Sequence, residues 1–148
     1  MMGKDEIVDT LNDLIRIVED SHEGYRQAAE AVREEDLKAL FNDLAAQRGA
    51  IVRELQRLVA EQGGAPDMGG TVIGGAHRFF LELKNNVLGH DREAILNEVQ
   101  RGETECVNRY DVALAKELPL PITTVVVQHL DRIRVDRDRM SMLRGATA

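Results

Sequence analysis

Apolar residues recur every three or four positions along most of the chain, which is the spacing that places them on one face of a helix. The first such run predicts a helix over about residues 4–34. Its apolar face is formed by Val8, Leu11, Ile15, Val18, Tyr25, Ala29 and Val32. The next run predicts a helix over residues 37–62, which ends before two consecutive glycines. Because only a short turn separates these helices, they are expected to form an antiparallel hairpin.

Three more helices are predicted in the second half of the chain. Residues 71–88 give a shorter helix, and residues 91–118 give a longer one that ends at a Pro-Leu-Pro segment. The last helix is predicted over residues 121–144. One of its sides carries Val126, Leu130, Ile133, Arg137 and Met140. Its β-branched run at 123–127 would also suit a strand, but no alternating partner segment is present, so a buried helix start is preferred.

Internal similarity indicates how the helices are arranged. The sequence YRQAA at 25–29 and the sequence YDVAL at 110–114 stand at the same point of two long helices. Each of these helices is followed by one with an arginine on its apolar side, so two helical hairpins are expected. The segment 63–90 joins them, and its helix of ~27 Å is long enough to cross a bundle, as the single crossover of ferritin-like folds does. The sequence therefore predicts one all-α domain over residues 1–148, a four-helix bundle of two antiparallel hairpins with a helical crossover.

Composition restricts the functional classes. The chain carries a net charge of −7, which disfavours a nucleic-acid surface because such surfaces are basic. No stretch of ~18 apolar residues is present to span a bilayer, and the first residues lack the pattern of a secretory signal. Cys106 is the single cysteine, which excludes a disulfide within the chain and a paired-cysteine metal site. A soluble, cytoplasmic protein is expected.

Polar residues interrupt the apolar helix faces at His22, Arg48, Glu103 and Arg137. Facing polar side chains inside a helical bundle are how such folds build metal sites. Arginine is always cationic and has no lone pair to offer a metal ion. The two arginines therefore argue against a metal site at these positions.

Short segments on several predicted helices resemble one known family. They are LNDLI at 11–15, EGYRQAA at 23–29, QR at 47–48, EL at 54–55, GE at 102–103, ELP at 117–119 and DRM at 138–140. Together they resemble the ferritin-like bacterial proteins of domain of unknown function 2383, over nearly the whole chain. The resemblance implies a ferritin-like bundle without an assigned biochemical role. Similar bundles are often connected with stress responses.

The wider ferritin-like superfamily implies a di-iron site, built from a Glu on each of two helices and a Glu-x-x-His pair on each of the other two. Of the expected ligands, Glu103 is present. The other positions carry residues that do not suit iron, namely Val18, Arg48, Ile51, Arg134 and Arg137. A metal-free protein without a catalytic or cofactor site is therefore expected. In place of the metal, Glu103 is predicted to form an ion pair with Arg48, Arg137 or both.

One metal-like pattern remains in the first predicted helix, where Glu19 and His22 stand three residues apart. A further ligand would have to come from Glu23, Glu98, Glu103 or Glu105. Such a degenerate carboxylate site would give the alternative function, a metal-binding protein with oxidase, peroxidase or iron-storage activity. A histidine that is hydrogen-bonded to a neighbouring carboxylate is preferred. The remaining histidines are expected at the surface or its boundary: His77, His90 and His129.

Tyr25 and Tyr110 are expected to fill core space, although tyrosines can also relay electrons or protons in an oxidase. Cys106 is expected to behave as a small buried hydrophobe. In the third predicted helix, Phe79 and Phe80 form an apolar face that suits a second copy of the chain. The leading hypothesis is a metal-free structural or interaction protein that forms a homo-oligomer, in the simplest form a dimer, and binds an unidentified protein partner. An enzymatic role stays open but is not favoured.

Overall fold

The computed structural model of the chain describes residues 2–68 and 91–145. Within these residues it consists of four helices and contains no strand. The helices are α1 (Lys4–Ala31), α2 (Glu35–Glu61), α4 (Arg92–Leu114) and α5 (Leu120–Gly145). Helix α1 packs on α2, α4 packs on α5, and α1 also packs on α4. The predicted all-α four-helix bundle of two antiparallel hairpins is confirmed.

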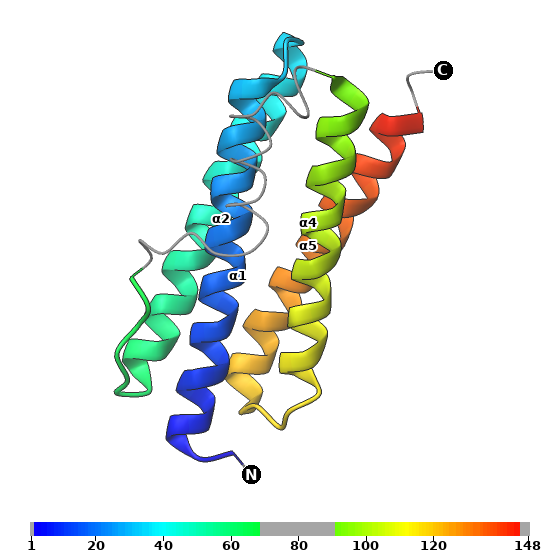
Figure 1. Cartoon of the computed structure of the whole chain (residues 1–148). Coiled ribbons are helices and arrows are strands. Elements are labelled where there is room, and N and C mark those ends of the chain that lie inside the picture. The colour runs from blue at the N-terminus through cyan, green and yellow to red at the C-terminus, as the bar shows by residue number, and fades with distance from the viewer. Residues whose placement is uncertain (1, 69–90, 146–148) are drawn as a thin grey trace.

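The helices alternate in direction around the bundle. Figure 1 shows α1 and α5 running one way and α2 and α4 running the other way. Helix α2 ends at the end of the bundle that holds the N-terminus, whereas α4 begins at the opposite end (Figure 1). The connection between the hairpins therefore joins opposite ends of the bundle, as a crossover requires. The helix predicted over residues 71–88 lies outside the described residues, as do Phe79 and Phe80.

The helix ends differ from the predicted ends by a few residues, for local reasons. Helix α1 stops at Ala31 rather than at residue 34, because the backbone at Val32 and Glu34 is extended. Helix α2 ends at Glu61, and Gly63 follows it at a φ of +78°, a left-handed conformation that glycine adopts without a Cβ penalty. Helix α4 begins at Arg92 and is capped by Asp91, whose carboxylate accepts hydrogen bonds from two backbone N–H groups of the first turn.

Helix α5 begins at Leu120, between the two prolines of the Pro-Leu-Pro segment. The β-branched run at 123–127 is helical, so the prediction of a helix over a strand is confirmed. Two threonine hydroxyls donate to backbone carbonyls here: Thr123 to Leu118 at 3.1 Å and Thr124 to Leu120 at 3.0 Å. These local bonds from a hydroxyl to a carbonyl four or five residues earlier give the threonine side chains a partner nearby in the chain.

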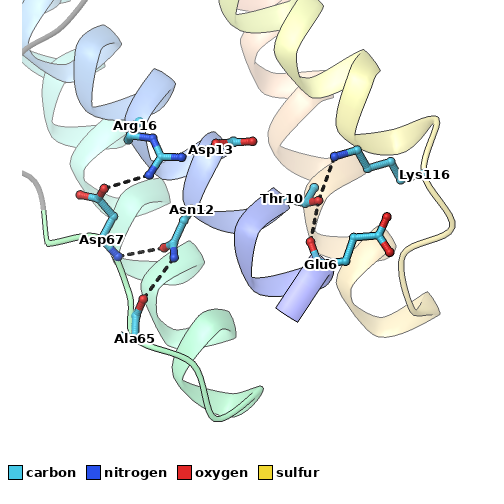
Figure 2. A network of polar contacts seen from close by, with 8 residues as sticks. All are labelled: Glu6, Thr10, Asn12, Asp13, Arg16, Ala65, Asp67 and Lys116. Carbon is cyan, nitrogen blue, oxygen red and sulfur yellow. Dashed lines mark hydrogen bonds and ion pairs between the residues drawn. The ribbon is translucent and has the colours of Figure 1, made fainter. Parts of the chain in front are cut away.

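The N-terminal half of α1 is tied on two sides to segments that follow other helices (Figure 2). On one side, the Asn12 Oδ1 accepts from the backbone N–H of Asp67 at 2.8 Å, and the Arg16 guanidinium pairs with the Asp67 carboxylate at 3.2 Å. On the other side, the Lys116 Nζ donates to the Thr10 Oγ1 at 3.2 Å. These contacts hold the end of the α2 segment and the end of the α4 segment against the same helix.

The interior of the bundle contains two apolar clusters. One includes Ile15, Leu55 and Val126, and the other includes Phe41 and Met140. Each cluster takes side chains from all four helices, so the packing holds the two hairpins together along the bundle. In the described residues, none of the helices has an apolar stretch of the length needed to cross a membrane.

Candidate functional site

A layer of polar side chains lies between the two apolar clusters. Each helix contributes one member, and we call the group Ser21, Arg48, Glu103 and Asp136 the central cluster. The three charged members are no more than 2% exposed. On α5, for example, Asp136 lies between Ile133 of one apolar cluster and Met140 of the other. The polar layer therefore occupies the middle of the core.

The Arg48 guanidinium is the centre of this cluster. Its Nη1 donates to the Glu103 Oε1 at 2.5 Å and its Nη2 donates to the Glu103 Oε2 at 2.6 Å, which is a bidentate pair. The same Nη2 donates to the Asp136 Oδ2 at 2.9 Å, and Nη1 also donates to the Ser21 hydroxyl at 2.7 Å. One arginine thus connects the other three helices.

A second arginine, on the surface, balances the charge of the central cluster. Arg48 faces two carboxylates, and the Nε of the half-exposed Arg132 lies 3.5 Å from the Asp136 Oδ1. Burial acts to lower the pKa of Arg48, but the Glu103 carboxylate opposes it and the pKa lies well above its ordinary value. Arg48 therefore stays charged, and two cations balance two carboxylates.

Tyr25 packs beside the central cluster. The Arg48 guanidinium carbon lies 5.3 Å from the centre of its ring, within the range of a cation–π contact. Burial, with a smaller effect from Glu103, raises the pKa of Tyr25 well above its usual range, so the phenol stays protonated. In the described residues its hydroxyl has no hydrogen-bond partner. The ring, rather than the hydroxyl, makes the main contact with the cluster.

The structure agrees with part of the predicted ion pairing and corrects the rest. Glu103 pairs with Arg48, as the sequence predicted. The pairing of Glu103 with Arg137 is wrong, because the Arg137 side chain is 30% exposed and its Nε lies 3.5 Å from Asp138. Asp136 takes the buried position instead. Steps of three and of four from Ile133 lead equally to Asp136 and Arg137, and both keep Met140 inside, so the apolar spacing alone did not decide between them.

The model of the family described as a domain of unknown function (DUF2383) matches residues 6–116, which is more than half of the chain. The chain belongs to the DUF2383 family. No curated protein matches it significantly. In this DUF2383 protein the match includes Arg48 and Glu103, whereas Asp136 lies beyond it on α5. The family assignment therefore identifies part of the central cluster and leaves its role open.

The central cluster of this DUF2383 protein does not fit a di-iron site. The Arg48 guanidinium donates to Glu103 and to Asp136, so it occupies lone pairs that a metal ion would need. It also places a positive charge between the two carboxylates. Among the described residues, no three His, Cys, Asp or Glu side chains lie close enough to hold a metal ion.

The alternative site at Glu19, His22 and Glu103 is not assembled either. The His22 Nδ1 lies 2.7 Å from the backbone carbonyl oxygen of Ala45, so the ring faces α2. Glu103 is already bound by Arg48 and also accepts from the Ser21 hydroxyl at 3.3 Å. The hydrogen bond expected for His22 is present, but its partner is a carbonyl rather than a carboxylate.

A second buried polar group connects α2, α4 and α5, and we call it the histidine chain. The Tyr110 hydroxyl lies 3.3 Å from the His129 Nδ1, and the His129 Nε2 lies 2.5 Å from the Glu54 Oε1. Tyr110 and His129 are buried, while the Glu54 side chain is 43% exposed. The prediction of His129 at the surface or its boundary is wrong, because these two partners satisfy both ring nitrogens. His77 and His90 lie outside the described residues.

Protonation in the histidine chain follows from burial. Burial lowers the pKa of His129, and the Glu54 carboxylate only partly opposes this. Burial raises the pKa of Tyr110 well above its usual range. The assignment that satisfies every group has the Tyr110 hydroxyl donating to Nδ1 and the Nε2–H donating to Glu54. The chain is then neutral except at its half-exposed carboxylate.

The remaining candidate groups are closed to solvent. Tyr25 and Tyr110 are buried, as predicted for residues that fill the core. Cys106 is fully buried, and burial raises the pKa of its thiol to about 12, so it behaves as the predicted small hydrophobe. A pocket of about 50 Å³ lies between α1 and α4 beside Glu103, which is room for a water or two rather than for a substrate.

Proposed function

We propose that this DUF2383 protein is a metal-free, ferritin-like bundle that acts as a structural or interaction protein. The observation that carries the proposal is the position of Arg48, whose guanidinium fills the space between Glu103 and Asp136. In a ferritin-like metal protein, carboxylates from facing helices would converge on the metal in that space. Here an internal cation replaces it, and the cluster links four helices instead of supplying a reactive centre.

The order and direction of the helices support the ferritin-like part of the proposal. The two hairpins are joined between opposite ends of the bundle, so α2 and α4 run in the same direction (Figure 1). A single connection of this kind is a property of ferritin-like bundles, whereas simple up-and-down bundles join neighbouring ends by short loops.

The closed nature of the polar groups supports a role that does not depend on catalysis. Arg48, Glu103 and Asp136 are no more than 2% exposed and are bound to one another. A substrate cannot reach a general acid, base or nucleophile that is sealed in this way. We expect contacts with other proteins, a second copy included, to carry the function. The cytoplasmic location and the link to a stress response stay predictions.

Metal analysis tests this proposal. The protein is purified without chelator, loaded with ferrous iron under anaerobic conditions, desalted and analysed for metal per chain. We expect no stoichiometric iron in the wild type. The same measurement is made on Glu103→Ala and on its matched control Glu93→Ala, a more exposed glutamate on the same helix that is not among the candidate ligands. All three proteins are expected to remain equally free of iron.

Bound iron would overturn the proposal, and the variants identify its site. Iron near one per chain that disappears in Glu103→Ala but persists in Glu93→Ala would make the central cluster a non-standard metal site. Iron that is lost on His22→Ala would instead favour the alternative metal-binding function through Glu19 and His22.

A further inference from the structure

Helix α5 has apolar side chains on both of its faces. The inner face packs into the core through Val126, Leu130 and Ile133. On the outer face, large apolar side chains are between 39% and 77% exposed: Leu120, Val127, Val135 and Met142. A surface helix usually carries its polar residues on this side. The outer face of α5 is therefore more apolar than its position in a four-helix bundle requires.

The exposed apolar residues lie on one narrow stripe. Steps of seven residues return to nearly the same side of the helix, and the step of eight from Val127 to Val135 turns by about 80°, so the four residues lie within roughly a quarter of the helix circumference. The positions between them on the same side are polar and exposed: Thr124, Asp131 and Asp138. The stripe extends for ~33 Å along the helix at 1.5 Å per residue. We call these seven residues, 120 to 142, the outer stripe.

The outer stripe is symmetric about Asp131. Leu120 and Met142 stand eleven positions before and after it, and Val127 and Val135 stand four positions before and after it. When a second copy of α5 is laid antiparallel across the first, with Asp131 on the two-fold axis, each apolar residue meets an apolar residue. Self-complementarity of this kind is what a two-fold interface between identical subunits requires, because the same patch must match itself.

We propose that a second copy of this chain docks on the outer stripe, with the two α5 helices antiparallel. Leu120 of each copy then packs on Met142 of the other, and Val127 packs on Val135. A stable interface buries roughly 800 Å² on each partner, and the stripe extends along most of α5 to supply the contact length. The aliphatic parts of Gln128 and Arg134 beside the stripe add to the buried area.

Asp131 gives the interface a distinctive weakness. On the two-fold axis it faces its own copy, and two carboxylates that face each other repel. Arg134 lies one turn away with its side chain 45% exposed, so it can reach across the axis toward the second Asp131. In the single chain Arg134 pairs with Asp111 at 3.1 Å, and this ion pair would have to rearrange. This proposal rests on the proposed interaction role, and it does not depend on the metal content of the central cluster.

Sedimentation analysis over a range of concentrations tests the surface. The wild type is expected to form a dimer, and Val135→Asp is expected to be monomeric at concentrations where the wild type is dimeric. The matched control is Val112→Asp, which places the same charge on an exposed valine of α4 outside the stripe. It should leave the dimer intact. A wild type that is monomeric at all concentrations, or a dimer that Val135→Asp does not weaken, overturns the proposal.

A charge swap at the axis tests the two-fold geometry itself. Asp131→Arg mixed with the wild type should form a heterodimer that is roughly tenfold tighter than either homodimer, because only the mixed pair places opposite charges on the axis. Native mass spectrometry of the mixture measures the three species. A statistical mixture of one part, two parts and one part means that Asp131 does not face its copy, and it overturns the antiparallel arrangement.

Discussion

The central cluster and the histidine chain are both buried between helices, but they differ in charge and in access to water. The central cluster joins Arg48 to two carboxylates, and its charged members are almost completely enclosed. The histidine chain joins two neutral groups and ends at the half-exposed Glu54. Removing one partner leaves a buried charge uncompensated, which costs about 3–5 kcal/mol, whereas a buried neutral group left without its partner costs about 1–3 kcal/mol. The two groups should therefore respond very differently to substitution.

The difference also concerns how the helices are aligned. Each helix contributes one side chain to the central cluster, and the positions on either side of it belong to the apolar clusters. Sliding any helix by one turn would place an apolar side chain against the Arg48 guanidinium. We infer that the central cluster selects one axial register of the bundle, although it need not add net stability. The histidine chain connects only three helices, so it favours one axial register less strongly.

The largest effect is expected from removal of the Glu103 charge. In Glu103→Gln the Arg48 guanidinium keeps Asp136 but loses its bidentate partner. Breaking a buried pair in this way costs about 3 kcal/mol or more of unfolding free energy. For a chain of this size the melting temperature should fall by roughly 10 °C, measured by circular dichroism. A melt that matches the wild type would show that the pair is not buried in solution.

A triple variant separates charge from packing. Replacing Arg48 with Met and both Glu103 and Asp136 with Leu removes every buried charge of the cluster while keeping similar volumes. Its loss of stability should be smaller than that of Glu103→Gln, because no charge is left without a partner. If the triple variant is the less stable of the two, the hydrogen bonds of the cluster contribute more than its desolvation costs.

The next effect in size is expected in the histidine chain. Tyr110→Phe removes the hydroxyl that bonds the His129 Nδ1, and a neutral buried hydrogen bond contributes about 1 kcal/mol. The melting temperature should fall by roughly 2–4 °C. Tyr25→Phe is the matched control, because the Tyr25 hydroxyl has no hydrogen-bond partner among the described residues. Equal losses in the two variants would contradict the role given to the Tyr110 bond.

The fold could be predicted from sequence because its signals are local. Apolar spacing gave the four described helices, and proline or glycine gave some of their ends, such as the end of α2 and the start of α5, to within a few residues. Arg48 and Glu103 could also be found, because each interrupts an otherwise apolar face. Asp136 could not be separated from Arg137, since the choice depends on which of them meets Arg48 on a different helix.

The histidine chain could not be predicted for a related reason. Glu54 and His129 are separated by 75 residues and come from different hairpins. No acidic residue stands three or four positions before or after His129, so the sequence shows no carboxylate partner for it on the same helix. Only the packing of α2 near α5 brings the carboxylate and the imidazole together. Contacts between hairpins depend on tertiary packing. The spacing of apolar residues along a helix does not show which residues of another hairpin it will meet.

The smallest expected effect is a pH dependence that originates in His129. Its pKa in the folded chain lies below the ordinary value of 6.5, so the unfolded chain binds a proton that the folded chain does not. The stability contributed by the neutral ring is fully present above about pH 6.5, the ordinary pKa of histidine. It is lost as the pH falls from about 6.5 through the lowered folded value. The free energy of unfolding of the wild type should therefore decrease as the solution is acidified over this window.

A comparison with His129→Gln isolates this contribution from those of the other histidines. Glutamine can accept from the Tyr110 hydroxyl and donate to Glu54 without titrating. Denaturant unfolding of both proteins is measured from about pH 7 to about pH 5, across the window where histidine titrates. The wild type should lose more stability than the variant over that range. Parallel pH profiles would mean that His129 takes up its proton as readily in the folded chain as in the unfolded chain. The contrast drawn between a neutral histidine chain and a charged central cluster would then be wrong, because burial would not be holding His129 in its neutral form.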